Sequence, residues 1–194
     1  MMPDSVELID ADTGQPVFAV LLPEITTAQM IAAEARWAPL RSPTAEHSHW
    51  DWSVKTGALA RPGVRCMGIM HDGEMQGMAM LVETGKAARL GADQGRPLVY
   101  IDFLEAAPWN LGPVSPPVRG FRAVGVRLVA AAVARSRALG YAGRVGLHSL
   151  EQAEGFYQYG CGMQTTGPDV RYHTLSYWEL TAATAGTRFP EEAS

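Results

Sequence analysis

The sequence predicts one α/β domain in which helices cover a mixed β-sheet. The chain has 194 residues and a mass of 20.9 kDa, which is enough for one hydrophobic core. Hydrophobic residues make up 47% of the chain and charged residues 19%, which excludes an intrinsically disordered protein. Two hairpin patterns and a helix pattern come first, and strand and helix patterns then alternate, as in a sheet covered by helices. We take residues 1–182 as this domain and residues 183–194 as a flexible tail.

The N-terminal part predicts a hairpin followed by a helix. Residues 6–22 contain two short apolar runs around an Asp-Thr-Gly turn, which is typical of a β-hairpin. Residues 27–37 are rich in Ala, Gln, Met and Glu, which favour a helix. Thr26 or Thr27 caps the start of this helix, and Pro39 ends it.

A loop, a second hairpin and a central strand are expected next. Residues 41–63 are polar and aromatic, which predicts a loop with room for one short helix. Residues 64–83 form two apolar runs around a His-Asp-Gly turn, so we expect a hairpin there. Residues 85–96 are a charged, glycine-rich connection, and the apolar, aromatic run over residues 97–107 predicts a central strand.

The remaining sequence alternates helices and strands. Residues 108–120 hold four prolines, so this segment is a loop that cannot pair in a sheet. A helix over residues 124–140 ends at a glycine, and a strand follows over residues 144–150. The capping-box spacing of a serine and a glutamine, Ser149 and Gln152, predicts the start of another helix. A last strand is expected over residues 172–180.

Charge and cysteine content narrow the classes of function. The chain has 16 basic and 20 acidic residues, a formal charge of −4, so bulk charge does not hold it on nucleic acid. The N-terminus lacks a basic segment before an apolar run, and no stretch reaches the roughly 18 apolar residues of a membrane span. Cys66 and Cys161 suit a reducing compartment and do not form a cysteine-rich zinc site. We expect a soluble cytoplasmic protein with neither nucleic-acid nor membrane partners.

Positive charge is concentrated in one segment of the chain. Residues 106–150 contain six arginines and no acidic residue, so this segment carries +6 while the remainder sums to −10. The loop within this segment leads into the helix over residues 124–140, and a helix N-terminus binds anions through unpaired N–H groups and its dipole. We expect Arg119 and Arg122 to meet phosphate through their planar donors. Arg135 and Arg137 have the positions of ordinary surface charges on an exposed helix face.

The order of strand, proline-bearing loop, basic turn, long helix, strand and aromatic-bearing helix resembles the GNAT superfamily of acyl-CoA-dependent N-acyltransferases. The resemblance covers residues 65–181 and leaves residues 1–64 as the part that shapes the acceptor site. It implies a mixed, mostly antiparallel, twisted sheet flanked by helices, with splayed central strands that bind coenzyme A. It also implies transfer of an acetyl or other short acyl group from acyl-CoA to an amine, and it leaves a homodimer open as the oligomeric state.

The resemblance places the phosphates of acyl-CoA at a turn before the long helix. The family turn reads Q/R-x-x-G-x-G/A, and with its last glycine on Gly125 the first glycine falls on Ala123 and the Q/R position on Gly120. The turn is therefore only partly kept, and Arg119 or Arg122 stands in for the missing side chain. The implied cofactor-binding residues of this turn are Arg119, Gly120, Phe121, Arg122, Ala123, Val124, Gly125 and Val126.

The segment AEGFYQYGCGM resembles the family motif A-x-x-L/F-Y, which places Tyr157 at the position of the usual general acid. The glycine after it lies one residue further along than in the family, and Leu150 stands where many members have asparagine. A phenol with a pKa near ~10 can donate a proton to a departing thiolate. Without the resemblance, Tyr157 would equally suit an ordinary packed aromatic.

The central strand corresponds to the family strand whose backbone grips the pantetheine arm and faces the thioester oxygen. We assign this role to Leu104, Glu105 and Ala106, because acyl transfer needs a backbone N–H donor near the carbonyl oxygen. Asp102 and Glu105 point to opposite faces of the strand, so only one of them can serve a given site. Glu105 is our first choice for the general base that deprotonates the amine, and His148 is the alternative. His148 would equally suit a structural hydrogen-bonding role.

The aromatic and acidic cluster around residue 50 suggests a wall of the acceptor pocket. Indole faces attract cations and a carboxylate can hold an ammonium group, so Trp50, Asp51 and Trp52, together with Asp102, form the candidate substrate-binding set. Core packing of the two tryptophans is an equally good interpretation. We predict no metal site, because no third and fourth ligands accompany the nearby histidines, His47 and His49.

The sequence therefore predicts an N-acyltransferase in which a primary amine, on a small molecule or a peptide, attacks acetyl-CoA or another short acyl-CoA directly. The altered turn leaves a second hypothesis open, a non-catalytic acyl-CoA-binding or regulatory module. A dinucleotide-binding domain is disfavoured, because residues 120–125 lack the GxGxxG spacing and no acidic residue follows until Glu151.

Overall fold

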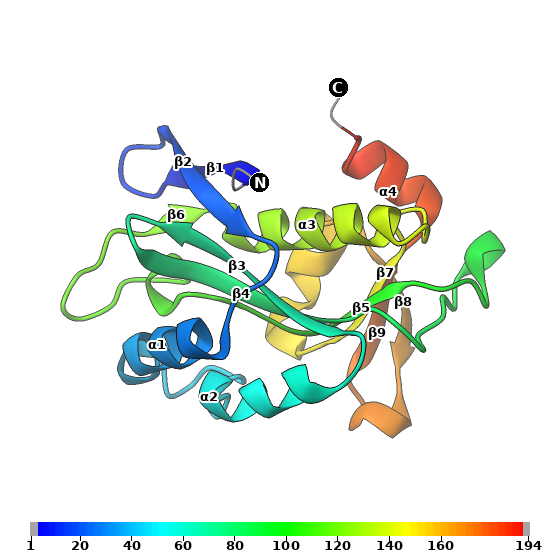
Figure 1. The fold of residues 1–194 in the computed structure, drawn as a ribbon, viewed down its shortest axis with the longest axis horizontal. Helices are drawn as coiled ribbons and strands as arrows, with labels where there is room; N and C mark the ends of the chain where they lie inside the picture. The colour runs from blue at the N-terminus through cyan, green and yellow to red at the C-terminus, as the bar shows by residue number, and fades with distance from the viewer. Residues whose placement is uncertain (1–3, 192–194) are drawn as a thin grey trace. The chain divides into compact units, whose positions relative to one another are not determined.

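The computed structural model describes residues 4–191 and contains one mixed, mostly antiparallel sheet flanked by helices, which confirms the predicted fold class (Figure 1). Its strands are β1 (Asp4–Asp10), β2 (Pro16–Leu22), β3 (Val64–His71), β4 (Glu74–Val82), β5 (Val99–Ala106), β6 (Phe121–Arg122), β7 (Val145–Ser149), β8 (Gln164–Pro168) and β9 (Ser176–Leu180). The order of hydrogen-bonded neighbours is β6-β1-β2-β3-β4-β5-β7-β9-β8. β5 and β7 run parallel, whereas β1–β2, β1–β6, β2–β3, β7–β9 and β8–β9 are antiparallel pairs.

The helices fall between these strands. The α-helices are α1 (Thr27–Trp37), α2 (Trp52–Lys55), α3 (Val124–Ala138) and α4 (Ala182–Arg188), and the segment Phe156–Gly160 forms a π-helical turn. Short 3-10 turns are Ala38–Leu40, Thr56–Ala60, Gly91–Asp93, Pro108–Asn110, Glu151–Ala153 and Val170–Tyr172. None of the helices within the described part of the chain combines the length and the apolar character needed to cross a membrane.

The chain divides into two compact units. The first unit comprises residues 1–80 and 103–128, and the second comprises residues 81–102 and 129–194. Strands β4 and β5 and helix α3 pass from one unit into the other. Each unit is described by itself below.

The N-terminal hairpin of the first unit forms as predicted. β1 pairs with β2 antiparallel, and Asp10 closes the turn by accepting hydrogen bonds from the backbone of Asp12 and from the backbone and hydroxyl of Thr13. The hairpin also gains a partner that the sequence did not indicate, because the two-residue strand β6 pairs with β1. β6 begins directly after the proline-rich loop. Its two residues are too few to show the alternation of apolar and polar residues that predicts a strand.

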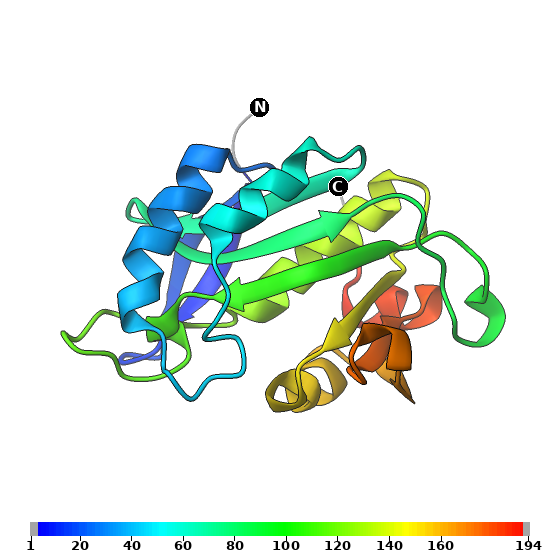
Figure 2. The same cartoon turned by 90° about the horizontal axis from the view of Figure 1, so that it is seen from below.

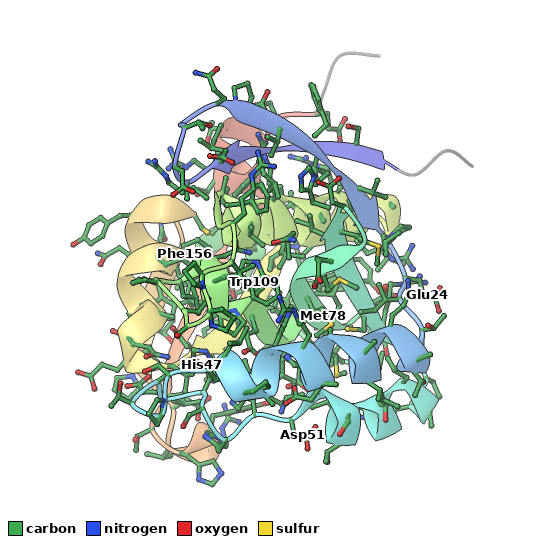
Figure 3. All side chains as sticks on the ribbon, turned by 90° about the vertical axis from the view of Figure 1, so that its left-hand side faces the viewer. Glu24, His47, Asp51, Met78, Trp109 and Phe156 are labelled. Atoms are coloured by element: carbon green, nitrogen blue, oxygen red, sulfur yellow. The ribbon has the colours of Figure 1, made fainter. Side chains whose placement is uncertain are left out.

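Helices α1 and α2 lie side by side over one face of the strands of the first unit, and the opening of α3 lies over the other (Figures 1 and 2). Thr26, and not Thr27, is the N-cap of α1, where it forms a capping box with Gln29. The core under α1 and α2 is built from side chains of both helices, of the strands and of the turn Pro108–Asn110: Met30, Trp37, Trp52, Cys66, Met78, Met80 and Trp109. Figure 3 shows Met78 on the strands beneath α1 and Asp51 at the start of α2.

The second unit has β7 at its centre. β5 pairs with β7 in parallel, through Val99–Val145 to Ile101–Leu147, and β9 pairs antiparallel with both β7 and β8. Leu98, Tyr100 and Tyr177 form a small buried cluster on these strands. The predicted last strand is shorter than expected, since β9 begins at Ser176, and β8 before it was not predicted.

Two predictions in the second unit are wrong. Ser149 does not cap the helical segment after β7: its hydroxyl donates to the carbonyl of Leu150, and the N-cap residue is Leu150, which has no capping side chain. The tail is not loose over residues 182–188, because Thr181 caps α4 and Ala185 is completely buried against Gly143. Tertiary packing, which the sequence pattern does not display, stabilises this short helix. The part of the expected tail at residues 192–194 lies outside the described residues.

The close approach of α3 to β4 gives a stability prediction. A Cβ atom at Gly77 would lie 2.6 Å from Cγ1 of Val124 and 3.2 Å from the carbonyl oxygen of Glu105, so only glycine fits there. We expect Gly77→Ala to lower the free energy of unfolding by about 1–3 kcal/mol. The control is Gly57→Ala, because nothing lies within 4 Å of a Cβ atom at Gly57. Urea denaturation measures both, and equal stabilities of the two variants would contradict the close packing.

Candidate active site

The opening of α3 presents unpaired backbone donors. Ala123 precedes the helix with a φ of +72°, and its carbonyl accepts the first helical hydrogen bond, from Arg127. The N–H groups of the first turn, at residues 124–126, therefore have no partner within the helix, and the positive end of the helix dipole coincides with them. A left-handed alanine is uncommon, which shows that the surrounding structure holds this turn in a fixed conformation.

The backbone before α3 is also held in place. A Cβ atom at Gly120 would lie 2.7 Å from the carbonyl oxygen of Trp109, so this position of the predicted phosphate turn requires glycine. The carbonyl of Gly120 accepts from the amide of Ala11, and the amide of Phe121 donates to the side chain of Asn110 at 2.7 Å. These contacts fix the backbone that leads into the first turn of α3.

The arginines near this turn are paired with the β1 hairpin. Arg119 donates to the buried carboxylate of Asp10. The hydrogen bond from the backbone of Thr13, with those from Arg119 and the Thr13 hydroxyl, holds the pKa of Asp10 well below its usual range. Arg122 donates to the carbonyl of Ala11 at 3.0 Å, and Arg127 donates to the carbonyl of Glu7 at 2.8 Å. The side chain of Arg119 is still 52% exposed to solvent.

The arginines of the second unit are not simple surface charges, contrary to expectation. Arg135 forms two hydrogen bonds with Glu83, at 2.7 and 2.9 Å, and Arg137 donates to the carbonyls of Ala185 and Phe189. Arg144 donates to the carbonyl of Pro97 and reaches Asp93. The +6 segment of the sequence is therefore partly neutralised by acidic residues from elsewhere in the chain.

Tyr157 lies in the π-helical turn of the second unit. The amide of Cys161 donates to the carbonyl of Phe156, and the amide of Met163 donates to the carbonyl of Tyr157. Tyr157 is buried, with 7% of its surface exposed, and burial raises the pKa of its phenol. None of the residues that the structure describes forms a hydrogen bond with its hydroxyl. A protonated phenol with a free O–H is suited to donate a proton.

Glu105 lies in a buried charge cluster of the first unit. Its carboxylate accepts from Arg41 at 2.7 Å and from the indole N–H of Trp52 at 2.6 Å. Arg41 also forms two bonds of 2.7 Å with Glu34 on α1, and Nε2 of His47 lies 3.8 Å from Glu105. We call Glu34, Arg41, Trp52 and Glu105 the Arg41 cluster.

The pKa of Arg41 reflects its position in this cluster. Burial alone would lower the pKa of Arg41, but its bonds to Glu34 and Glu105 outweigh burial and raise it. Protonation of Glu105 would break the pairing with Arg41 and leave that guanidinium incompletely bonded in the interior. The arrangement therefore suits Glu105 as a fixed acceptor of hydrogen bonds better than as a proton carrier.

Sequence analysis missed Glu34 and Arg41. Met30, Ala33, Glu34 and Trp37 share the buried face of α1. A glutamate on this apolar stripe is the signal that could have marked Glu34 as a residue with a buried partner. No comparable signal marks Arg41, because a single arginine in a polar segment is ordinary.

The proposed acceptor wall is only partly available to a ligand. Asp51 caps α2 by accepting from the backbone and hydroxyl of Ser53, which lowers its pKa, and Trp52 is completely buried in the core. Trp50 is half-buried, with its ring edge-on to Phe103 at 5.1 Å between centroids. Trp52 contacts both Phe103 and Glu105, so these two strand residues share a face. Asp102, on the second unit, is half-buried.

His148 is held on three sides within the second unit. Its Nδ1 lies 2.7 Å from the hydroxyl of Tyr100, its Nε2 lies 3.4 Å from Asp169, and its ring stacks on Tyr172 at 3.7 Å. Burial lowers the pKa of His148, while Asp169 opposes this shift. In the neutral ring, Nε2–H donates to Asp169 and Nδ1 accepts from Tyr100, since Asp169 is itself held ionised by Arg171 and Arg89.

Three solved structures show how this fold compares with known proteins. A bacterial toxin is 9% identical with a TM-score of 0.59 and covers 100% of this chain and 99% of its own. AtaTR, crystallised with acetyl-CoA, is 14% identical with a TM-score of 0.57 and covers 88% of this chain and 98% of its own. A protein from Chromobacterium violaceum, assigned to the GNAT family of acetyltransferases, is 12% identical with a TM-score of 0.54 and covers 86% and 88%.

No protein-family model and no curated protein sequence matches the chain. The similarity to known proteins is thus one of structure, at identities too low to carry individual residues across. The polypeptide therefore has the fold of the GNAT acetyltransferases.

Proposed function

We propose that the protein is an N-acyltransferase that moves an acetyl or other short acyl group from acyl-CoA to a primary amine, on a small molecule or a peptide. The observation that carries this proposal is the preorganised opening of α3, with its left-handed Ala123 and its free amides, in a chain with the GNAT fold. AtaTR, which shares the fold, was crystallised with acetyl-CoA.

The residues at the α3 opening fit the phosphates of acyl-CoA. The amides of residues 124–126 bind the diphosphate through N–H donors and the helix dipole, and Gly120 and Ala123 allow its close approach. Arg119, whose position is fixed by its hydrogen bond to Asp10, donates further hydrogen bonds to the phosphates. When bound, acyl-CoA supplies the thioester whose carbonyl carbon the amine attacks.

Residues of the chain itself supply the oxyanion donor, the general acid and the general base. The backbone of β5 at residues 104–106 donates a hydrogen bond to the developing oxyanion. Tyr157 donates its phenolic proton to the departing sulfur. Either Glu105 or His148 takes the proton of the amine: Glu105 accepts from Arg41, and His148 is neutral but its Nδ1 accepts from the hydroxyl of Tyr100. Both substrates bind together, so no acyl-enzyme intermediate is needed.

A non-catalytic acyl-CoA-binding module is the second candidate. It is favoured by the engagement of Arg119 and Arg122 with the β1 hairpin and by the alanine at position 123. The two candidates differ in one measurement. Release of free thiol from acetyl-CoA in the presence of a panel of amines occurs with an enzyme, whereas a binding module binds the cofactor without turnover.

Replacement of Tyr157 by phenylalanine tests the assigned acid. We expect Tyr157→Phe to lower the rate of thiol release by about 10²–10⁴-fold, because the leaving thiolate loses its proton donor. The affinity for CoA, measured by calorimetry, should stay the same, since the ring and its packing are retained. An unchanged rate at every pH would show that another group serves the thiolate.

A charge placed in the first turn of α3 tests the phosphate site. We expect Gly125→Asp to weaken CoA binding by about tenfold or more, because the new carboxylate repels the diphosphate. The helix itself should still form, since a negative charge in its first turn interacts favourably with the helix dipole. Gly125→Ala is the matched control, since it changes the size of the residue without adding charge. Calorimetry with CoA gives both dissociation constants, and equal values would place the phosphates elsewhere.

The pH dependence of the reaction distinguishes the two candidate bases. A neutral His148 accepts protons only above its own pKa, which lies below the ordinary histidine value of about 6.5, so kcat/KM should fall as the pH drops through that region. We expect His148→Gln to remove this acidic limb and Glu105→Gln to keep it. A limb that persists in His148→Gln and disappears in Glu105→Gln would assign the base to Glu105.

A further inference from the structure

We propose that Lys55 is a site of self-acylation, at which the protein transfers an acyl group from acyl-CoA to its own side chain. This inference rests on the proposed function, because it uses the same cofactor and the same strand. Lys55 is the last residue of α2, a helix fixed in position by the Asp51 cap and by the buried ring of Trp52. Its backbone is therefore anchored to the Arg41 cluster.

The amino group of Lys55 lies against β5. Its Nζ is 4.0 Å from the centroid of the Phe103 ring and 5.2 Å from that of Trp50. Two aromatic rings thus attract the ammonium group by cation–π interaction and restrict where it can lie. Phe103 directly precedes residues 104–106, the backbone that we propose to face the thioester. The lysine amine is the primary amine that the first unit itself places beside that strand.

Nothing in the described part of the chain occupies this amino group as a hydrogen-bond or ion-pair partner. Burial lowers the pKa of Lys55, and the attraction of Glu105 offsets only part of this effect. A larger fraction of the group is consequently neutral near pH 7 than in an exposed lysine. A positioned amino group without a hydrogen-bond or ion-pair partner can attack a thioester once it has lost its proton.

The other lysine of the chain provides an internal control. The sequence contains two lysines, Lys55 and Lys86. The amino group of Lys86 donates to the hydroxyl of Tyr172 at 2.9 Å and lies 4.4 Å from the centroid of the Tyr100 ring. Lys86 therefore also rests on aromatic rings, but its ammonium is used in a hydrogen bond. If Lys55 is acylated faster than Lys86, the presence of an aromatic neighbour alone therefore cannot explain the difference.

The proposed reaction balances without a further reagent. The lone pair of the Lys55 amine attacks the thioester carbonyl carbon, an N–C bond forms, and the C–S bond breaks. The Lys55 ammonium first releases one proton to solvent. On attack the amine nitrogen gives up a second proton, the departing sulfur takes up one, and the products are an amide on Lys55 and free CoA. The amide is neutral, so the Arg41 cluster loses a neighbouring positive charge.

The test is incubation of the full chain with acetyl-CoA and no added amine, followed by intact mass measurement and peptide mapping. We expect one acetyl group per chain on Lys55, at least about tenfold faster than on Lys86, with a rate constant independent of protein concentration. Lys55→Arg should abolish the modification, and Lys86→Arg should leave it unchanged. The same mixture in urea gives the intrinsic reactivity of both lysines, and the N-terminal amine is mapped separately.

Two results would overturn the proposal. One is a native ratio of Lys55 to Lys86 acetylation equal to the ratio in urea. The other is an unmodified Lys55 in protein that releases thiol with a supplied amine, which would remove self-acylation while the acyltransferase function stands. Failure of thiol release with every amine, together with no modification and no CoA binding by calorimetry, would instead remove the proposed function itself.

Discussion

The buried guanidinium of Arg41 is the interaction on which the candidate acceptor wall depends. Two carboxylates from distant elements, Glu34 of α1 and Glu105 of β5, can share the interior only because a positive charge lies between them. Removal of that charge would leave like charges unpaired, a change that costs roughly 3–5 kcal/mol in buried pairs. The cluster also receives the amide and the indole N–H of Trp52, so α1, α2 and β5 are joined by one polar network. This network fixes the position of α2, and with it the position of Lys55 at the end of that helix.

At the α3 opening the arginine side chains have partners, whereas the first backbone amides have none within the helix. The sequence concentrates six arginines around this region, yet Arg119, Arg122 and Arg127 are all bonded to β1 or its turn. Their structural effect is to hold the loop against the hairpin. The proposed phosphate site therefore rests on the N–H groups of residues 124–126, which follow the left-handed Ala123.

The two candidate bases show how environment separates residues that look alike in sequence. Glu105 and His148 each stand near the end of a central strand, and either could accept a proton on chemical grounds. In the folded chain Glu105 is committed to a guanidinium, whereas His148 is a neutral ring between a phenol and an ionised aspartate. The difference lies in partners that come from far along the chain, Arg41 for the first and Asp169 for the second.

The sequence by itself determined the elements whose signals are local. Hydrophobic period, turn residues and caps predicted the two hairpins, α1, α3 and the central strands, and the spacing around Gly125 and Tyr157 indicated the fold. Only the tertiary structure decided the rest. The two-residue β6 and the α4 helix are too short to have a periodic signal and exist through the neighbours that they contact. Charge partners are equally non-local, so the roles of Arg119, Glu105 and Lys55 were fixed by what folding brings beside them.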